Sequence, residues 1–177
     1  IQPVTEDVFR KISYRDRPDG LIAVAPRPEW GLQRLEGQES GVSALYLIAQ
    51  SIEKPGNLGT ILRTADAAGV DGVVVVDQCT DLYNPNVVRA SVGTLFTVPV
   101  AEATSDEALE WFKQRGIRLF ATSPDAKKNY NEADLSGPMA IVIGSEQYGL
   151  DGRRLESTDE QISIPMAGQA DSLNVAT

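Results

Sequence analysis

The chain has 177 residues, a length that suits one domain, with a net charge of −9, one cysteine and no histidine. The missing histidine excludes Ser-His-Asp and Cys-His nucleophilic sites, His-ligated zinc and a histidine general base. One cysteine cannot form an internal disulfide and fits a reducing cytoplasm, and no apolar run approaches the roughly 20 residues that cross a bilayer.

The acidic balance argues by itself against a nucleic-acid partner, because binding a polyphosphate needs Lys and Arg. Six of the 16 basic residues, however, fall in the first 34 positions, and others lie beside the motifs described below. Arg89, Arg153 and Arg154 are candidates for phosphate contacts, with an ordinary solvated surface as the alternative. The charge therefore leaves RNA binding open.

Residues 1–34 are predicted to be an N-terminal connector. Within them, residues 3–14 favour a short helix, and residues 15–25 favour a turn that leads into a strand. Residues 26–31 contain two prolines and a glycine, which is typical of a linker, so we place the start of the main domain, 35–177, after them.

From Ser43 onward, apolar runs of strand length alternate with amphipathic, helix-length segments. The predicted strands are 44–50, 72–77, 97–103, 118–123, 139–146 and 161–165, and the predicted helices are 57–69, 85–96 and 106–116. A polar loop is expected at 125–137. Alternation of this kind predicts an α/β fold, a parallel sheet flanked by helices on both faces.

Ligands of such sheets bind beyond the carboxyl ends of the strands. The loops after the strands 44–50, 118–123, 139–146 and 161–165 therefore form the candidate site. Neither a phosphate-binding P-loop nor a G-x-G-x-x-G turn is present, and no acidic cluster indicates a metal.

Three segments carry a more specific signal: NLGTILRTADAAG at 57–69, IVIGSEQYGL at 141–150 and ISIPMAGQADSLNVAT at 162–177. Taken together and in this order, they resemble motifs 1, 2 and 3 of the SpoU/TrmH RNA 2′-O-ribose methyltransferases of the SPOUT class. The resemblance implies a C-terminal deep trefoil knot, a homodimer, and S-adenosylmethionine-dependent methylation of a ribose 2′-hydroxyl in RNA.

The resemblance also implies the catalytic residues, which are Arg63, Asn57, Glu146, Ser172 and Asn174. Because a guanidinium rarely deprotonates, we expect Arg63 to bind a phosphate and to stabilise the developing alkoxide rather than to act as the base. An ion pair with Asp66 is the structural alternative for Arg63.

The other four catalytic candidates have structural expectations as well. Asn57 is expected to be a helix N-cap, and Glu146 to orient Asn57 or Arg63. Ser172 is expected to cap a following helix, and Asn174 to anchor the substrate ribose.

S-adenosylmethionine is, by the same resemblance, held by Thr122, Gly144, Ile164, Met166 and Leu173, with no metal involved. A glycine at 144 lets the backbone approach a ligand closely, and Met166 offers a soft apolar surface.

Residues 9–25 resemble the linker that follows a small RNA-recognition domain in the rRNA-modifying branch of the family. This favours rRNA, 23S rRNA above all, over tRNA. The resemblance of the third motif implies a further C-terminal helix, which we expect to be missing from the domain 35–177. Three alternatives stay open: a tRNA ribose methyltransferase, a knotted RNA-binding protein without activity, and an α/β metabolite-binding domain.

Overall fold

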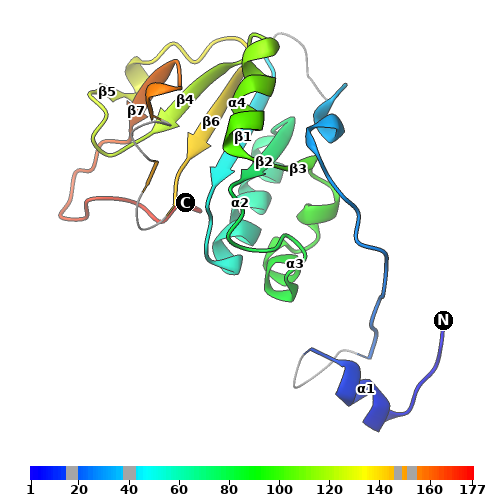
Figure 1. Cartoon of the computed structure of the whole chain (residues 1–177). Coiled ribbons are helices and arrows are strands. Elements are labelled where there is room, and N and C mark those ends of the chain that lie inside the picture. The colour runs from blue at the N-terminus through cyan, green and yellow to red at the C-terminus, as the bar shows by residue number, and fades with distance from the viewer. Residues whose placement is uncertain (15–19, 38–42, 146–148, 151–154) are drawn as a thin grey trace.

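The computed structural model describes residues 1–14, 20–37, 43–145, 149–150 and 155–177. Their centre is a seven-stranded, wholly parallel sheet in the order β3-β2-β1-β6-β4-β7-β5 (Figure 1). The strands are β1 (Leu45–Gln50), β2 (Gly72–Val76), β3 (Val100–Ala103), β4 (Arg118–Thr122), β5 (Lys128–Asn129), β6 (Met139–Ile143) and β7 (Glu160–Ser163). The predicted parallel α/β sheet is confirmed.

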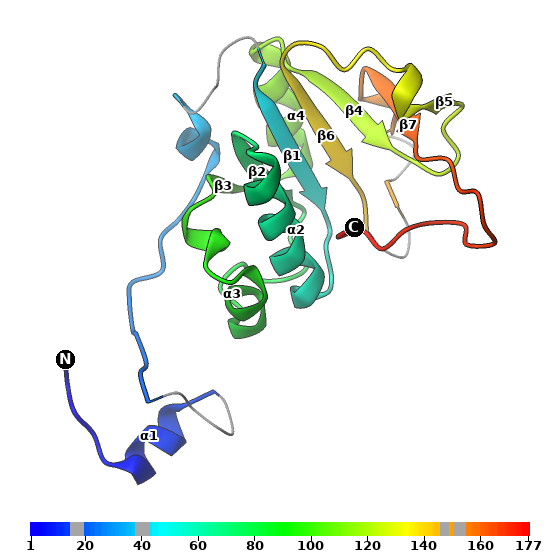
Figure 2. The same cartoon turned by 180° about the vertical axis from the view of Figure 1, so that it is seen from behind.

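Helices α2 (Pro55–Ala68), α3 (Pro85–Ser91) and α4 (Ser105–Gln114) cover both faces of this sheet, as expected from its apolar strands. Helix α1 (Glu6–Ile12) lies away from the sheet, and 3₁₀ turns occur at η1 (Leu32–Leu35), η2 (Thr94–Phe96) and η3 (Tyr130–Glu132). α2 and α3 lie on one face, and α4 and η1 lie on the other (Figures 1 and 2). In the described ranges, no helix is long and apolar enough to span a membrane.

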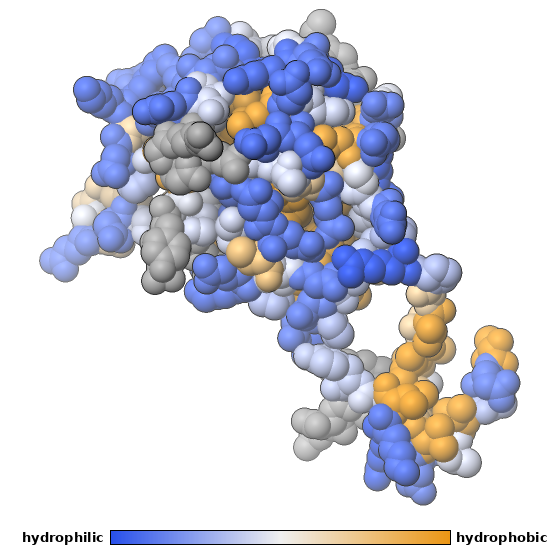
Figure 3. Space-filling view, in the orientation of Figure 1, coloured by the Kyte–Doolittle hydropathy of each residue, from blue (hydrophilic) through white to orange (hydrophobic). Residues whose placement is uncertain are grey.

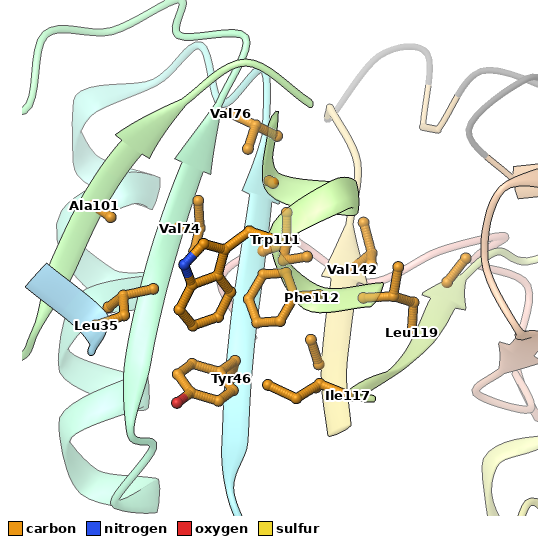
Figure 4. Packing of buried hydrophobic residues seen from close by; sticks show 14 of the residues in the cluster. Leu35, Tyr46, Val74, Val76, Ala101, Trp111, Phe112, Ile117, Leu119 and Val142 are labelled. Carbon is orange, nitrogen blue, oxygen red and sulfur yellow. The ribbon is translucent and has the colours of Figure 1, made fainter. Parts of the chain in front are cut away.

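The α4 side of the sheet is filled by aromatic packing (Figure 4). Tyr46 of β1 and Phe112 of α4 meet edge to face with ring centroids 5.3 Å apart, and Trp111 packs on Phe112 at 4.9 Å. Such pairs contribute about 0.5–1.5 kcal/mol each beyond area burial. This layer fixes α4 against the middle of the sheet.

The opposite layer is built on α2. Its buried residues recur at the helical spacing of i, i+3, i+4 and i+7, from Leu58 to Ala65. A Cβ built on Gly59 would lie only 2.5 Å from the Ala90 Cβ of α3 and 2.8 Å from the Ser91 nitrogen. A glycine at position 59 therefore lets α3 pack directly on α2.

Three local expectations are wrong. Residues 20–25 form no strand, because no neighbouring strand lies beside them. The helix predicted over 85–96 is interrupted where Val92 and Gly93 take φ values of +52° and +96°, which separates α3 from η2. The loop expected at 125–137 contains β5 and η3, since β5 finds a distant partner in β7.

The order of the strands brings the predicted site loops to neighbouring positions on one edge of the sheet. β6 lies between β1 and β4, and β7 lies between β4 and β5. The carboxyl ends of β1, β6, β4 and β7 are therefore direct neighbours, and these four strands precede the loops that the sequence selects. The last residues return to this edge, where Ala176 is buried in the same cluster as Ala49 and Ile52.

Residues 1–14 and 20–26 lie in an arm that extends away from the body (Figure 1). None of the residues of α1 is buried. Apolar side chains gather over the arm (Figure 3), namely Val4, Val8, Ile12, Leu21, Ile22 and Val24. Where the chain joins the body, the Trp30 carbonyl accepts a hydrogen bond from the Glu102 N–H at 2.6 Å, and Leu35 is fully buried.

Candidate active site at the carboxyl edge of the sheet

Thr122 and Gly144 stand at the ends of the adjacent strands β4 and β6. The Thr122 hydroxyl donates a hydrogen bond to the Val142 carbonyl at 3.0 Å, which ties the two strands together at the edge. The side chain is half-buried. Thr122 therefore supports the floor of the site as well as lining it.

Gly144 meets a tight approach of backbone. Ser145 and Gly149 exchange two backbone hydrogen bonds, at 3.1 and 3.0 Å. A Cβ built on Gly144 would lie 2.5 Å from the Leu150 nitrogen and nearer still to Gly149. The expected close approach at 144 is present, but the chain's own backbone makes it. The candidate Glu146 lies outside the described residues.

The segment 164–177 follows β7 and passes along this edge. It contains no helix, and its apolar side chains at Ile164 and Leu173 are 54% and 50% exposed. Met166 is half-buried, and a Cβ on Gly168 would meet open space. Exposed apolar side chains in a segment fixed at its end by Ala176 offer a contact surface for a ligand.

Ser172 does not cap a helix, contrary to expectation. Its hydroxyl lies 3.2 Å from the Asp171 carboxylate. Asn174 makes the cap-like contacts instead, because its side-chain oxygen accepts from the Ala176 N–H at 2.9 Å and its carbonyl accepts from Thr177 at 2.9 Å. Both side chains are exposed at the surface of this segment.

Asn57 is not the N-cap of α2. The helix begins two residues earlier, with Pro55 at its first position and Lys54 as the cap. The Asn57 N–H donates to the Lys54 carbonyl at 3.0 Å. Asn57 consequently sits in the first helical turn, half-buried, close to the carboxyl end of β1.

Arg63 lies on the exposed surface of α2, six residues or about 9 Å beyond Asn57 along the axis. Within the described part of the chain it makes no ion pair, so the alternative pairing with Asp66 is absent. Its guanidinium is therefore available to an external anion.

A polar cluster at the ends of β1 and β2 was not predicted. The Asp77 carboxylate accepts from Gln50 at 2.9 Å, and from the hydroxyl and N–H of Ser105 at 2.5 and 3.1 Å. It joins the edge of the sheet to the start of α4, and Asp77 itself has a φ of +49°. The sequence does carry the signal, an acid directly after the buried run of β2.

Hollows in the described structure are lined in part by residues outside the predicted site. One of about 20 Å³ lies under α4 between Gln50, Ser105 and Val142, and an open one of about 520 Å³ borders residues 125–128, 155–156 and 158–161. No group of three His, Cys, Asp or Glu side chains suited to a metal occurs in the described ranges.

Comparison with known proteins gives a consistent result. The sequence profile of the SpoU rRNA Methylase family matches residues 44–177. The chain is 33% identical over 173 residues to the 23S rRNA (guanosine(2553)-2′-O)-methyltransferase RlmP of Bacillus subtilis, covering 98% of this chain and 66% of that protein.

Solved structures agree in fold. A crystal structure of an RNA 2′-O ribose methyltransferase matches with a TM-score of 0.80 and 47% identity, over 97% of this chain and 65% of that one. An AdoMet-bound rRNA methyltransferase from Sinorhizobium meliloti matches with a TM-score of 0.87 and 33% identity, over 97% and 65%. The chain thus spans slightly less than two thirds of these relatives, and the resemblance carried by the three motifs is confirmed.

Proposed function

Because this chain belongs to the SpoU rRNA Methylase family, we propose that its protein is an S-adenosylmethionine-dependent RNA methyltransferase. It transfers a methyl group to a ribose 2′-hydroxyl, with 23S rRNA as the substrate. The observation that carries this proposal is the family match over the sheet and all three motifs. The relatives named for 23S rRNA and for AdoMet support the substrate and the cofactor.

The proposed cofactor site uses Thr122, Gly144, Ile164, Met166 and Leu173. Ile164 and Leu173 expose apolar surface in the segment that follows β7, which supports their contact with such a group. S-adenosylmethionine supplies an activated methyl group, so no metal is needed for the transfer.

Arg63 is proposed to bind a phosphate of the RNA and to stabilise the alkoxide that develops on the ribose. Its exposure and lack of an ion pair support this role, since a guanidinium binds phosphate in a bidentate manner. Asn57, Glu146, Ser172 and Asn174 are proposed to hold the ribose in line with the methyl group. Alignment of this kind supplies several kcal/mol of barrier lowering.

Three finer features belong to the same proposal: a C-terminal deep trefoil knot, a homodimer and a cytoplasmic location. The insertion of β7 between β4 and β5 supports the knot, and the exposure of Arg63 supports a site completed by a second copy. Residues 1–34 are proposed as a connector or the end of an upstream RNA-recognition domain, and residues 35–177 as the methyltransferase domain. Sedimentation of the full-length protein tests the dimer.

A transfer assay with tritiated S-adenosylmethionine tests the activity on separate pools of rRNA and tRNA. We expect label in 23S rRNA, at a linkage that resists alkaline hydrolysis because its 2′-hydroxyl is blocked. Label confined to tRNA would move the substrate to the alternative class. RNA binding without any transfer would leave a knotted binding protein instead.

A further inference from the structure

Two exposed arginines lie on the neighbouring helices α2 and α3. Four other basic side chains of the body are held in ion pairs, which join Arg27 to Asp81, Arg115 to Glu36, Arg118 to Asp134 and Lys128 to Glu160. Arg63 of α2 and Arg89 of α3 are exposed and form no ion pair or side-chain hydrogen bond within the residues described. On a chain of net charge −9, they are cations open to an external anion.

The packing of α2 on α3 places one of these arginines on each of two helices in direct contact. Gly59 contacts Ala90 so closely that no side chain fits between the helices. Arg63 lies one turn, about 6 Å, beyond Gly59 on the same helix face, and Arg89 directly precedes Ala90. Since α3 follows the carboxyl end of β2, this pair lies beside the edge that carries the candidate site.

The N-terminal arm adds a third cation, Lys11, next to the surface that carries Arg63 and Arg89. The Asn86 amide of α3 donates to the Tyr14 hydroxyl at 3.2 Å, which attaches the arm just after α1. Asn86 and Arg89 share one face of α3, because they are three residues apart. Lys11, in the last turn of α1, is exposed and likewise makes no ion pair among the described residues. Figure 2 shows α1 beyond the end of α3, on the side to which β1 and β6 point.

We propose that Arg63, Arg89 and Lys11 form a phosphate-binding surface along which the RNA strand runs from the site, across α3, to the arm. This rests on the proposed function, since it supplies the path of that substrate. RNA is favoured as the occupant by local charge, because unpaired cations on this surface attract the phosphates of a polyanion.

Arg89→Ala, compared with Lys113→Ala, tests the surface. Lys113 is a matched control, because it is equally exposed and free of ion pairs in the described structure but lies on α4, on the opposite face of the sheet. Binding of a 23S rRNA transcript by the full-length protein is measured over a series of salt concentrations. We expect Arg89→Ala to weaken binding about tenfold at low salt and to reduce the slope of log K against log salt by about 1.

Two further variants test whether the charge at these positions binds the RNA. Arg89→Lys keeps the charge and should recover most of the affinity, and Lys11→Ala should lower the salt slope as Arg89→Ala does. Equal binding by Arg89→Ala and Lys113→Ala overturns the inference, and so does a loss of dimer in Arg89→Ala, which would mark a protein interface. A wild-type protein that binds rRNA through Arg89 but never methylates it would refute the proposed function while supporting this surface.

Discussion

Replacing Arg63 with alanine should lower the rate of methyl transfer about 100- to 1000-fold, the loss typical when one stabilising donor is removed from a developing oxyanion. The fold should be unaffected, because the side chain is exposed and makes no ion pair in the described structure. We expect the free energy of unfolding to change by no more than about 0.5 kcal/mol. Initial rates with tritiated S-adenosylmethionine, together with thermal unfolding of the same sample, measure both effects.

Arg63→Lys separates charge from geometry. A lysine keeps the positive charge but loses the planar, bidentate fork, so we expect it to recover part of the RNA affinity and little of the rate. Asp66→Ala serves as the control, since Asp66 lies three residues away on the same helix and forms no ion pair with Arg63. A wild-type rate in Arg63→Ala would remove this residue from the catalytic set.

Gly144→Ala should abolish binding of S-adenosylmethionine and destabilise the fold. The added Cβ would lie 2.5 Å from the Leu150 nitrogen, so Gly149 and Leu150 would have to move away from β6. Overpacking of this kind costs about 1–3 kcal/mol. Thermal unfolding and calorimetric titration with S-adenosylmethionine report the two effects separately.

Gly56→Ala is the matched control for that substitution. A Cβ at Gly56 meets nothing within 4 Å, and the position lies in the first turn of α2. We expect its stability to stay constant or to rise by about 0.5–1 kcal/mol, because alanine restricts the unfolded chain. If Gly144→Ala bound the cofactor as tightly as Gly56→Ala does, the pocket would have to lie elsewhere.

The local pattern of apolar residues was enough to predict most helices and strands of the body. Unbroken apolar runs gave the strands, and residues such as Leu58 and Ile61 gave the helical period of α2. The start of α2 two residues before Asn57 could also have been predicted, since Pro55 favours the first helical position, but the motif was taken to begin at Asn57. The break at Val92 was hidden, because a β-branched residue rarely takes a positive φ.

Long-range pairing was beyond a single sequence. The sequence around Lys128 does not predict a strand, because β5 is defined by its pairing with Ile162 of β7. The order of the elements along the chain also does not predict that β6 lies between β1 and β4. The candidate residues could nevertheless be assigned to one edge of the sheet, since all parallel strands end on one side whatever their order. The unpaired state of Arg63 and Arg89 needed the structure, because ion pairing depends on neighbours in space.

Strands β6 and β7 come late in the sequence but lie inside the sheet, and this affects how the chain folds during its synthesis on the ribosome. β1, β2 and β3 can pair as soon as they emerge, but β4 and β5 pair only with β6 and β7, which emerge afterwards. The edge that carries Thr122, Gly144 and Ile164 is thus assembled last, by contacts of long sequence separation, which form slowly. A nascent protein would expose an unfinished sheet until its final segments arrive, and would gain its ligand site only on completion.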